Sequence, residues 1–164
     1  MKTCVFAGTF DPFTVGHEEI VLKALKSYDK VIVVIGVNPE KEPTFSLSDR
    51  IEFIKETFKG NEKVEVEFHE GLMMDFMKKK GYTEYIRGIR DDQDLEYENV
   101  MKRNNLSFNP SVNTVFIKCD KPFSKISSSM IRNKLKNGES VKEYLPKNSA
   151  QKIITAFRKK QAQR

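Results

Sequence analysis

The ten residues from Gly8 to His17 combine glycine, hydroxyl and imidazole groups in an order that suits phosphate binding. Gly8 lets the backbone approach a ligand without a Cβ in the way, and Gly16 lets a helix begin close to the loop. The first turn of that helix presents free N–H groups and a partial positive charge to phosphate oxygens. His17 can then donate a hydrogen bond to a phosphoryl oxygen on which charge builds up. Taken alone, T-x-G-H is equally consistent with a turn that carries a surface histidine.

Three further segments carry groups that suit phosphate. Lys41 lies between two prolines, on a segment stiff enough to hold its ammonium group towards an acceptor phosphate. Arg87 and Arg90 flank a glycine, and guanidinium groups bind phosphate through two parallel hydrogen bonds. Ser127–Ser129 precede a helical segment, where their hydroxyl groups could bind a second phosphate or only cap the helix. In isolation, Lys41 is more simply explained as a solvated surface lysine.

The elements that position these segments alternate between strand and helix. Apolar and β-branched runs predict strands over residues 3–7, 31–37, 64–68, 83–87 and 114–118. Helical spacing of apolar residues predicts helices from 16 or 17 to about 26, from a Ser46 cap to Gly60, from Leu72 to Gly81, and over 94–104, 128–136 and 146–159. This alternation predicts an α/β protein with a Rossmann-like, doubly wound sheet of five mainly parallel strands and helices on both faces. Ligands of such sheets bind beyond the carboxyl ends of the strands.

The length of 164 residues fits one compact domain, residues 1–164, that ends in a C-terminal helix at about 146–160 and a basic tail. The longest apolar stretch, residues 31–37, is far shorter than the roughly 20 residues that a membrane-spanning helix needs. The N-terminus has no apolar h-region of a signal peptide. Cys4 and Cys119 lack metal-ligand spacing, so we expect reduced structural thiols in a cytoplasmic protein.

The charge of the chain is concentrated at its C-terminus. Lysine and arginine number 29 against 23 aspartates and glutamates, which gives a formal net charge of +6. Four of the basic residues, Arg158, Lys159, Lys160 and Arg164, lie in the last seven positions, and without them the excess falls from six to two. Such a tail is usually a solvated helix end, so nucleic-acid binding is not the favoured function.

The motifs also resemble those of a known enzyme family. Gly8–His17 lacks the phosphate-binding patterns of P-loop enzymes and dehydrogenases. It is similar instead to the G-[ST]-F-D-P-x-T-x-G-H signature of the phosphopantetheine adenylyltransferases, within the T/H-x-G-H superfamily of nucleotidylyltransferases. The resemblance continues in the family's order through Lys41 ahead of F-S-L, R-G-I-R at 87–90, D-L-E-Y-E at 94–98 and I-S-S-S-M-I-R at 126–132. It covers the chain from Val5 to about Pro146.

The resemblance implies transfer of the adenylyl group of ATP to 4′-phosphopantetheine, which gives dephospho-coenzyme A and pyrophosphate. Mg²⁺ is expected to arrive with ATP, with no metal ligand supplied by the protein. The chain offers no well-placed covalent nucleophile and the acceptor phosphate is itself nucleophilic, so direct in-line attack on the α-phosphorus is expected. The family also implies a homohexamer and feedback by coenzyme A.

The resemblance assigns roles to individual residues. Catalysis is assigned to His17 and Lys41. Acceptor binding is assigned to Thr9, Lys41, Met73 and Arg87. ATP binding is assigned to Thr9, Phe10, His17, Gly88, Ile89, Arg90, Glu98, Phe123, Ser124, Lys125, Ile126, Ser127, Ser128 and Ser129.

The chain departs from the family's pattern at Ala7, Val15, Asp91 and Asp92, and at residues 104–106, where the family lines the pantetheine arm. Two other functions remain open. One is another transferase of the superfamily, which uses CTP and glycerol 3-phosphate or ATP and nicotinamide mononucleotide. The serine turn lacks the arginine and glycine of the cytidylyltransferase version and disfavours the first of these. The other is a nucleotide-sensing or RNA-binding module that uses the basic tail.

Overall fold

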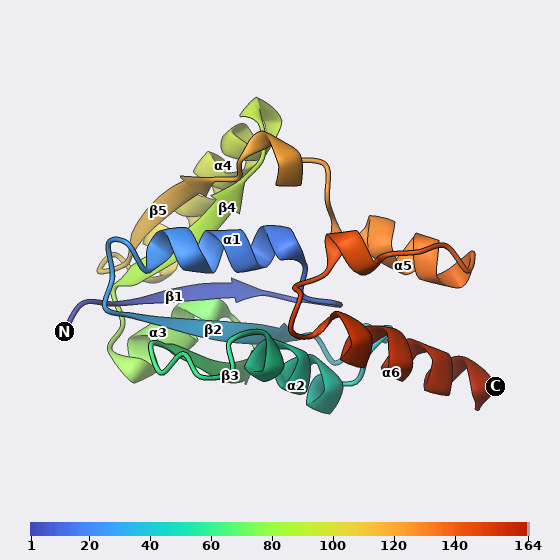
Figure 1. Cartoon of the computed structure of the whole chain (residues 1–164). Helices are drawn as coiled ribbons and strands as arrows, with labels where there is room; N and C mark the ends of the chain where they lie inside the picture. Colours follow the sequence, from blue (N-terminus) through green and yellow to red (C-terminus); the bar gives the residue numbers. More distant parts are fainter. Residues whose placement is uncertain (164) are drawn as a thin grey trace.

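A computed structural model describes residues 1–163 of the chain. Its five strands are β1 (Thr3–Gly8), β2 (Lys30–Val37), β3 (Val64–Glu70), β4 (Glu84–Ile89) and β5 (Asn113–Lys118). They form one sheet in the order β3-β2-β1-β4-β5, and every neighbouring pair is parallel (Figure 1). The order reverses between β1 and β4, which places a crevice beyond the carboxyl ends of these two strands. The predicted doubly wound α/β fold is confirmed, and the sheet is wholly parallel.

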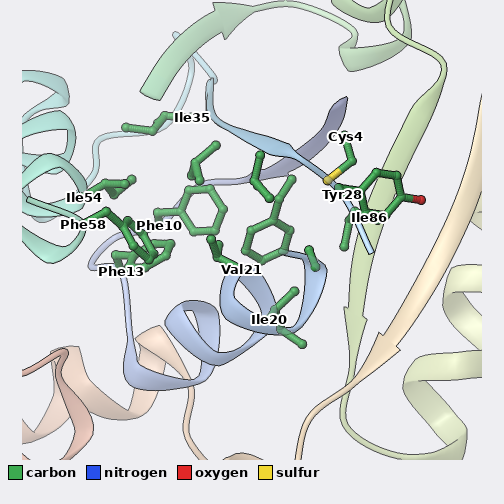
Figure 2. Close-up of a cluster of buried hydrophobic side chains, with 14 of the residues drawn as sticks. Cys4, Phe10, Phe13, Ile20, Val21, Tyr28, Ile35, Ile54, Phe58 and Ile86 are labelled. Atoms are coloured by element: carbon green, nitrogen blue, oxygen red, sulfur yellow. The ribbon is translucent and has the colours of Figure 1, made fainter. Parts of the chain in front are cut away.

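Helices cover both faces of this sheet. The six α-helices are α1 (Val15–Ala24), α2 (Leu47–Thr57), α3 (Met73–Lys80), α4 (Asp92–Phe108), α5 (Ser128–Lys136) and α6 (Ala150–Ala162). Side chains of α1 and α2 pack with alternate residues of β1 and β2 in the cluster that Figure 2 shows. The intervening strand residues face α3 on the other side, as the two-residue period of a strand requires.

Helices α5 and α6 lie beyond the carboxyl ends of the strands (Figure 1). They pack against α2 through a third apolar cluster that includes Phe45, Phe53, Ile131 and Ile153. This cluster holds the first turn of α5 beside the crevice of the sheet. The C-terminal helices therefore form one wall of the region where a doubly wound sheet binds its ligand.

The structure corrects several predicted boundaries. Strand β4 continues two residues past Arg87, because Gly88 and Ile89 pair with β5. Helix α4 runs from residue 92 to 108 rather than from 94 to 104. Helix α6 begins at Ala150 and not at Pro146, because Ser149 Oγ lies 2.8 Å from the Thr57 hydroxyl and this buried contact holds the preceding residues in a turn.

Three sequence-based expectations concern single residues and composition. Cys4 and Cys119 are both free and buried, as expected for structural thiols. No helix within residues 1–163 is long and apolar enough to cross a membrane. Arg164, the last residue of the predicted basic tail, lies outside the described residues.

Candidate active site

A cavity of about 310 Å³ lies at the carboxyl ends of β1 and β4 and beside the first turns of α1 and α5. Segments that are far apart in sequence meet here, because the carboxyl ends of parallel strands share one edge of the sheet. Ten of the predicted site residues line it: Thr9, Phe10, His17, Arg87, Gly88, Arg90, Phe123, Ile126, Ser127 and Ser128. The helix N-termini supply free N–H groups on two sides of the cavity.

The local structure around His17 fixes which ring nitrogen can serve a ligand. Thr14 is the N-cap of α1, and its side chain accepts a hydrogen bond from the His17 backbone N–H at 3.2 Å. In return, His17 Nδ1 lies 3.0 Å from the Thr14 backbone nitrogen. A backbone N–H can only donate, so Nδ1 must accept and the neutral ring carries its proton on Nε2. Within residues 1–163, Nε2 has no hydrogen-bond partner and is the donor left for a ligand.

The surroundings of His17 keep its imidazole ring neutral. Burial, and then the positive charges of Arg87 and Arg90, lower the pKa of His17 to about 4. Both effects disfavour the protonated ring, because charge is costly away from water and beside other cations. At neutral pH the free protein therefore presents a neutral Nε2–H donor rather than an imidazolium.

The side chain of Phe10 packs against the His17 ring. Its φ of 50° is unusual for a residue with a side chain, and its ring is only 3% exposed. The ring packs edge-on against His17 with 4.9 Å between centroids. A Cβ at Gly8 would come within 2.8 Å of the Phe10 ring, so Gly8 makes room for this phenylalanine. Gly8 also lines the cavity, so its role in the approach of a ligand stays a prediction.

Two arginines on the cavity wall are paired with carboxylates of α4. Arg87 donates to Glu98 at distances of 2.9 to 3.2 Å and to the Ala7 carbonyl oxygen at 3.0 Å. Arg90 donates to Asp94 at 2.9 Å. Glu98 is the buried residue of α4, and its contact with Arg87 orients the guanidinium group. These pairs leave the remaining N–H groups of both arginines available for phosphate.

Gly88 sits between these arginines where α1 crosses β4. A Cβ at this position would lie 3.2 Å from Ile20 Cγ1, closer than ordinary contact distance. A residue without a side chain therefore allows the first helix to approach the fourth strand. This close packing brings His17 and the two arginines to the same cavity.

Comparisons with known proteins identify the family to which this site belongs. The model of the cytidylyltransferase-like family matches residues 5–134. The phosphopantetheine adenylyltransferase of Caldanaerobacter subterraneus subsp. tengcongensis is 35% identical over 97% of this chain and 99% of its own. That of Clostridium botulinum strain 657 is 40% identical over 98% of this chain and 95% of its own. The chain belongs to the phosphopantetheine adenylyltransferase family. It is accordingly a nucleotidyltransferase, as the motifs predicted.

A solved structure gives independent support for the fold alone. A bifunctional NMN adenylyltransferase/ADP ribose pyrophosphatase from Francisella tularensis matches with a TM-score of 0.75 at 21% identity. The match covers 97% of this chain and 50% of that longer protein. The Rossmann-like architecture is thus shared beyond the phosphopantetheine adenylyltransferases.

Five predicted ATP-binding residues of this family member lie outside the lining of the cavity. Ile89 is the last residue of β4, and Lys125 is exposed. Ser124 donates its hydroxyl hydrogen to the Lys121 carbonyl oxygen at 2.9 Å. Ser129 accepts a hydrogen bond from Arg132 at 3.0 Å. Glu98, a fifth, meets the cavity only through Arg87.

Two predicted acceptor residues lie beside the cavity, one on a loop and one at the start of a helix. Lys41 is exposed in the segment between β2 and α2, and it has no side-chain partner within residues 1–163. Met73 begins α3, and its methyl group lies 3.9 Å from the position of a Cβ on Gly36, near the carboxyl end of β2. Both residues therefore belong to the edge of the sheet that carries the cavity, beside it rather than in its wall.

The serine turn at α5 combines capping with cavity lining. Ser127 is the N-cap of the helix and accepts from the Met130 backbone N–H at 3.1 Å. Ser128 donates its hydroxyl hydrogen to the Pro12 carbonyl oxygen at 2.8 Å. The structure shows the capping role of Ser127, while Ser127 and Ser128 also line the cavity, so phosphate binding by this turn stays a prediction.

Arg132, Asp11 and Cys119 line the cavity but were not assigned to it from the sequence. Arg132 donates to the Asp11 carbonyl oxygen at 2.8 Å and makes no ion pair with the described residues. Its spacing offered a signal, since it lies four residues after Ser128 and therefore on the same face of α5. Asp11 lies within the predicted Gly8–His17 loop, so the motif already placed it near the site. Cys119 gave no such signal, because only the tertiary fold brings it to the cavity.

The protein groups of the cavity suit phosphate better than a metal ion. Within residues 1–163, no three His, Cys, Asp or Glu side chains are arranged to hold a metal. The carboxylate of Asp11 binds two backbone N–H groups, and those of Asp94 and Glu98 bind arginines. A divalent cation would therefore be held chiefly by oxygens of a bound nucleotide and of water.

Proposed function

We propose that this chain transfers the adenylyl group of ATP to 4′-phosphopantetheine, which gives dephospho-coenzyme A and pyrophosphate, a step of coenzyme A biosynthesis. The observation that carries the proposal is the neutral His17 donor in a cavity that Arg87, Arg90 and Arg132 also line. Three guanidinium groups and two helix N-termini suit the phosphates of two substrates. Membership of the phosphopantetheine adenylyltransferase family supports this choice of acceptor.

The reaction needs placement and charge stabilisation. An oxygen of the acceptor phosphate attacks the α-phosphorus of ATP, and the bond from that phosphorus to the pyrophosphate oxygen breaks. His17 Nε2–H donates to an equatorial oxygen of the α-phosphoryl group, where negative charge increases in the transition state. Because the donor is already fixed by Thr14, little reorganisation is needed when the charge develops.

The acceptor is held by Thr9, Lys41, Met73 and Arg87. Arg87 presents the guanidinium edge that Glu98 leaves free. Lys41 brings an ammonium group from the loop after β2. This arrangement holds the attacking phosphate on the side of the cavity where β1, β2 and β4 end. Loss of the Lys41 side chain is expected to weaken binding of the acceptor and to slow the transfer.

The nucleotide shares Thr9 and the end of β4 with the acceptor, and its site extends to the first turns of α1 and α5. The ATP-binding residues are Thr9, Phe10, His17, Gly88, Ile89, Arg90, Glu98 and the segment from Phe123 to Ser129. Glu98 acts through its contact with Arg87, and Arg132 joins the group that the sequence assigned. Mg²⁺ bound to the nucleotide would neutralise the charge of the β- and γ-phosphates and of the leaving pyrophosphate.

The protein is proposed to act in the cytoplasm as a homohexamer, with coenzyme A as a feedback ligand. Exposed apolar side chains on α4 support an assembly: Tyr97, Val100 and Phe108. Large exposed apolar groups that gather on one surface mark interfaces between proteins. Nucleic acid is not a proposed partner.

Pyrophosphate release tests the proposed function. The protein is incubated with magnesium-ATP and 4′-phosphopantetheine, and separately with nicotinamide mononucleotide, or with CTP and glycerol 3-phosphate. We expect release only with ATP and 4′-phosphopantetheine. Release with another pair alone would contradict the proposed acceptor. Tight, steeply salt-dependent RNA binding without any release would favour the binding module instead.

A further inference from the structure

The loop that carries Lys41 is exposed, yet both of its ends are held. It begins at Val37, the last residue of β2, and the Lys41 backbone N–H donates to the Asn38 carbonyl oxygen at 3.1 Å. It ends at Thr44 and Phe45, just before α2. Phe45 is 1% exposed and packs in the apolar cluster beneath α5 and α6. The position of Lys41 therefore depends on how firmly this second end is fixed.

Asp11 binds the second end of the loop with both carboxylate oxygens. Oδ2 accepts from the Thr44 backbone N–H at 2.9 Å, and Oδ1 accepts from the Phe45 backbone N–H at 2.9 Å. The Asp11 side chain is 6% exposed, so water competes little for these charge-assisted bonds. Although Asp11 lines the cavity, both of its oxygens already hold backbone donors from a segment more than thirty residues away in sequence.

A second buried side chain joins the same two segments. Arg50 of α2 donates to the Phe45 carbonyl oxygen at 3.1 Å and to the Thr9 carbonyl oxygen at 3.0 Å. From the opposite side, Lys160 of α6 donates to the Thr44 carbonyl oxygen. The N–H and C=O groups of residues 44 and 45 are thus bound by side chains from three separate parts of the chain.

The phosphate-binding loop that carries Asp11 is itself fixed. Arg132 of α5 donates to the Asp11 carbonyl oxygen at 2.8 Å, and the Ser128 hydroxyl group donates to the Pro12 carbonyl oxygen at 2.8 Å. Asp11 is therefore a rigid joint between the loop that carries His17 and the loop that carries Lys41. Two residues lie between Lys41 and Thr44, and these three Cα–Cα steps confine the Lys41 Cα to within about 10 Å of the anchored Thr44.

We propose that Asp11 is a positioning residue for the transfer reaction, which holds the Lys41 loop against the phosphate-binding loop so that the Lys41 ammonium group reaches the acceptor phosphate. This inference rests on the proposed function of Lys41. Asp11 touches neither substrate through its carboxylate. It acts through the backbone of residues 44 and 45, and its loss displaces Lys41 while the ATP side of the cavity keeps its contacts.

The Asp11→Asn variant tests the inference, because it turns one acceptor oxygen into an NH₂ group that faces a backbone N–H donor. We expect turnover to fall on the order of 10-fold to 100-fold, the usual cost of a misplaced reacting group. The KM for 4′-phosphopantetheine is expected to rise, and the dissociation constant for ATP to stay nearly unchanged. Backbone amide exchange at Thr44 and Phe45 is expected to accelerate.

A double-mutant cycle with Lys41→Ala separates positioning from general damage to the structure. If Asp11 acts through Lys41, the double variant is no slower than Lys41→Ala alone. Additive losses of turnover would overturn the inference, as would unchanged exchange at Thr44 and Phe45 in Asp11→Asn. A wild-type protein that releases no pyrophosphate would contradict the proposed function, and the amide exchange would still test the anchor.

Two further variants guard against a folding artefact. Asp29→Asn is the matched control, because Asp29 also accepts a long-range backbone N–H, from Lys2 at 2.7 Å, at the opposite end of the sheet. We expect it to keep wild-type turnover. If Asp11→Asn does not fold by circular dichroism, Lys160→Met removes a donor to the same segment from outside the cavity. Lys160→Met is expected to lower turnover less than Asp11→Asn does. If the inference is right, adding Lys160→Met to Lys41→Ala lowers turnover no further, and a further loss would overturn the inference.

Discussion

At the residue scale, His17 carries two tasks on one imidazole ring. Nδ1 completes the capping box of α1 with Thr14, and Nε2 remains for a phosphoryl oxygen. The capping contact makes the ring part of the helix terminus, so the donor is oriented before any substrate arrives. A single histidine therefore joins the local stability of α1 to the chemistry of the cavity.

Replacement of His17 separates these tasks. We expect His17→Ala to lower turnover on the order of 100-fold to 1,000-fold, because a donor aimed at developing charge is lost. The dissociation constant of ATP, measured by calorimetry, is expected to change only a few-fold. His17→Gln keeps a capping acceptor and an amide donor, and it is expected to recover part of the turnover. Turnover of His17→Ala close to that of the wild type would contradict the catalytic role.

The lowered pKa of His17 also predicts a pH-dependent stability. The unfolded chain binds a proton at this ring below its ordinary pKa of about 6.5, whereas the folded chain does so only near 4. Acid therefore favours the unfolded state, and the folded protein loses up to about 3 kcal/mol as the pH falls through this window. Urea unfolding at pH 7 and pH 4.5 should show a loss in the wild type that is smaller in His17→Gln. Equal losses would exclude His17 as the cause.

At the element scale, two serine-capped helices provide a matched pair. Ser127 caps α5 beside the cavity, and Ser46 caps α2 away from it, each accepting a backbone N–H at 3.1 Å. Either serine-to-alanine change is expected to lower the free energy of unfolding by about 1 kcal/mol. Only Ser127→Ala is expected to weaken ATP binding as well, by roughly tenfold. Equal ATP affinity of the two variants in calorimetry would contradict a nucleotide role for the serine turn.

Elements defined by local signals were predictable from the sequence. The Ser46 and Asp49 spacing marks the start of α2, and α5 has the predicted bounds, because a cap and an apolar stripe are properties of neighbouring residues. The predicted start of α6 at Pro146 is wrong, because the Ser149 side chain forms a hydrogen bond with Thr57, 92 residues away. The end of β4 was missed because Ile89 is a strand residue only through its pairing with Lys118 of β5.

The same division between local and long-range contacts explains which parts of the candidate site could be predicted from the sequence. The loop with His17 was found because its motif is continuous in sequence. The contacts that hold this loop in place were not predicted. Arg132 binds the Asp11 carbonyl oxygen across 121 residues, and Asp11 binds the Phe45 backbone N–H across 34. Such contacts leave no periodicity to read. They follow from the parallel sheet, which gathers the carboxyl ends of distant strands at one edge.

At the scale of the whole molecule, α4 presents an apolar stripe that the single chain does not cover. At about 100° per residue, Tyr97, Val100 and Phe108 lie within about 80° of one another on this helix. Their exposed fractions are 62%, 45% and 59%. Glu98, which binds Arg87, lies about 80° from Phe108, to one side of this stripe. The helix thus joins a candidate subunit interface to Arg87, the arginine proposed to hold the acceptor.

Light scattering tests this surface as the site of assembly. The wild-type protein is expected to have six times the mass of one chain, and Val100→Glu to have a lower mass, because a buried unpaired carboxylate is costly at an apolar interface. Leu22→Glu is the matched control, since Leu22 of α1 is 48% exposed but stands alone on its helix. A monomeric wild-type protein would contradict the hexamer. An undiminished mass of Val100→Glu would place the interface elsewhere. If the variant does dissociate, its turnover shows whether α4 needs a neighbouring subunit to hold Glu98 against Arg87.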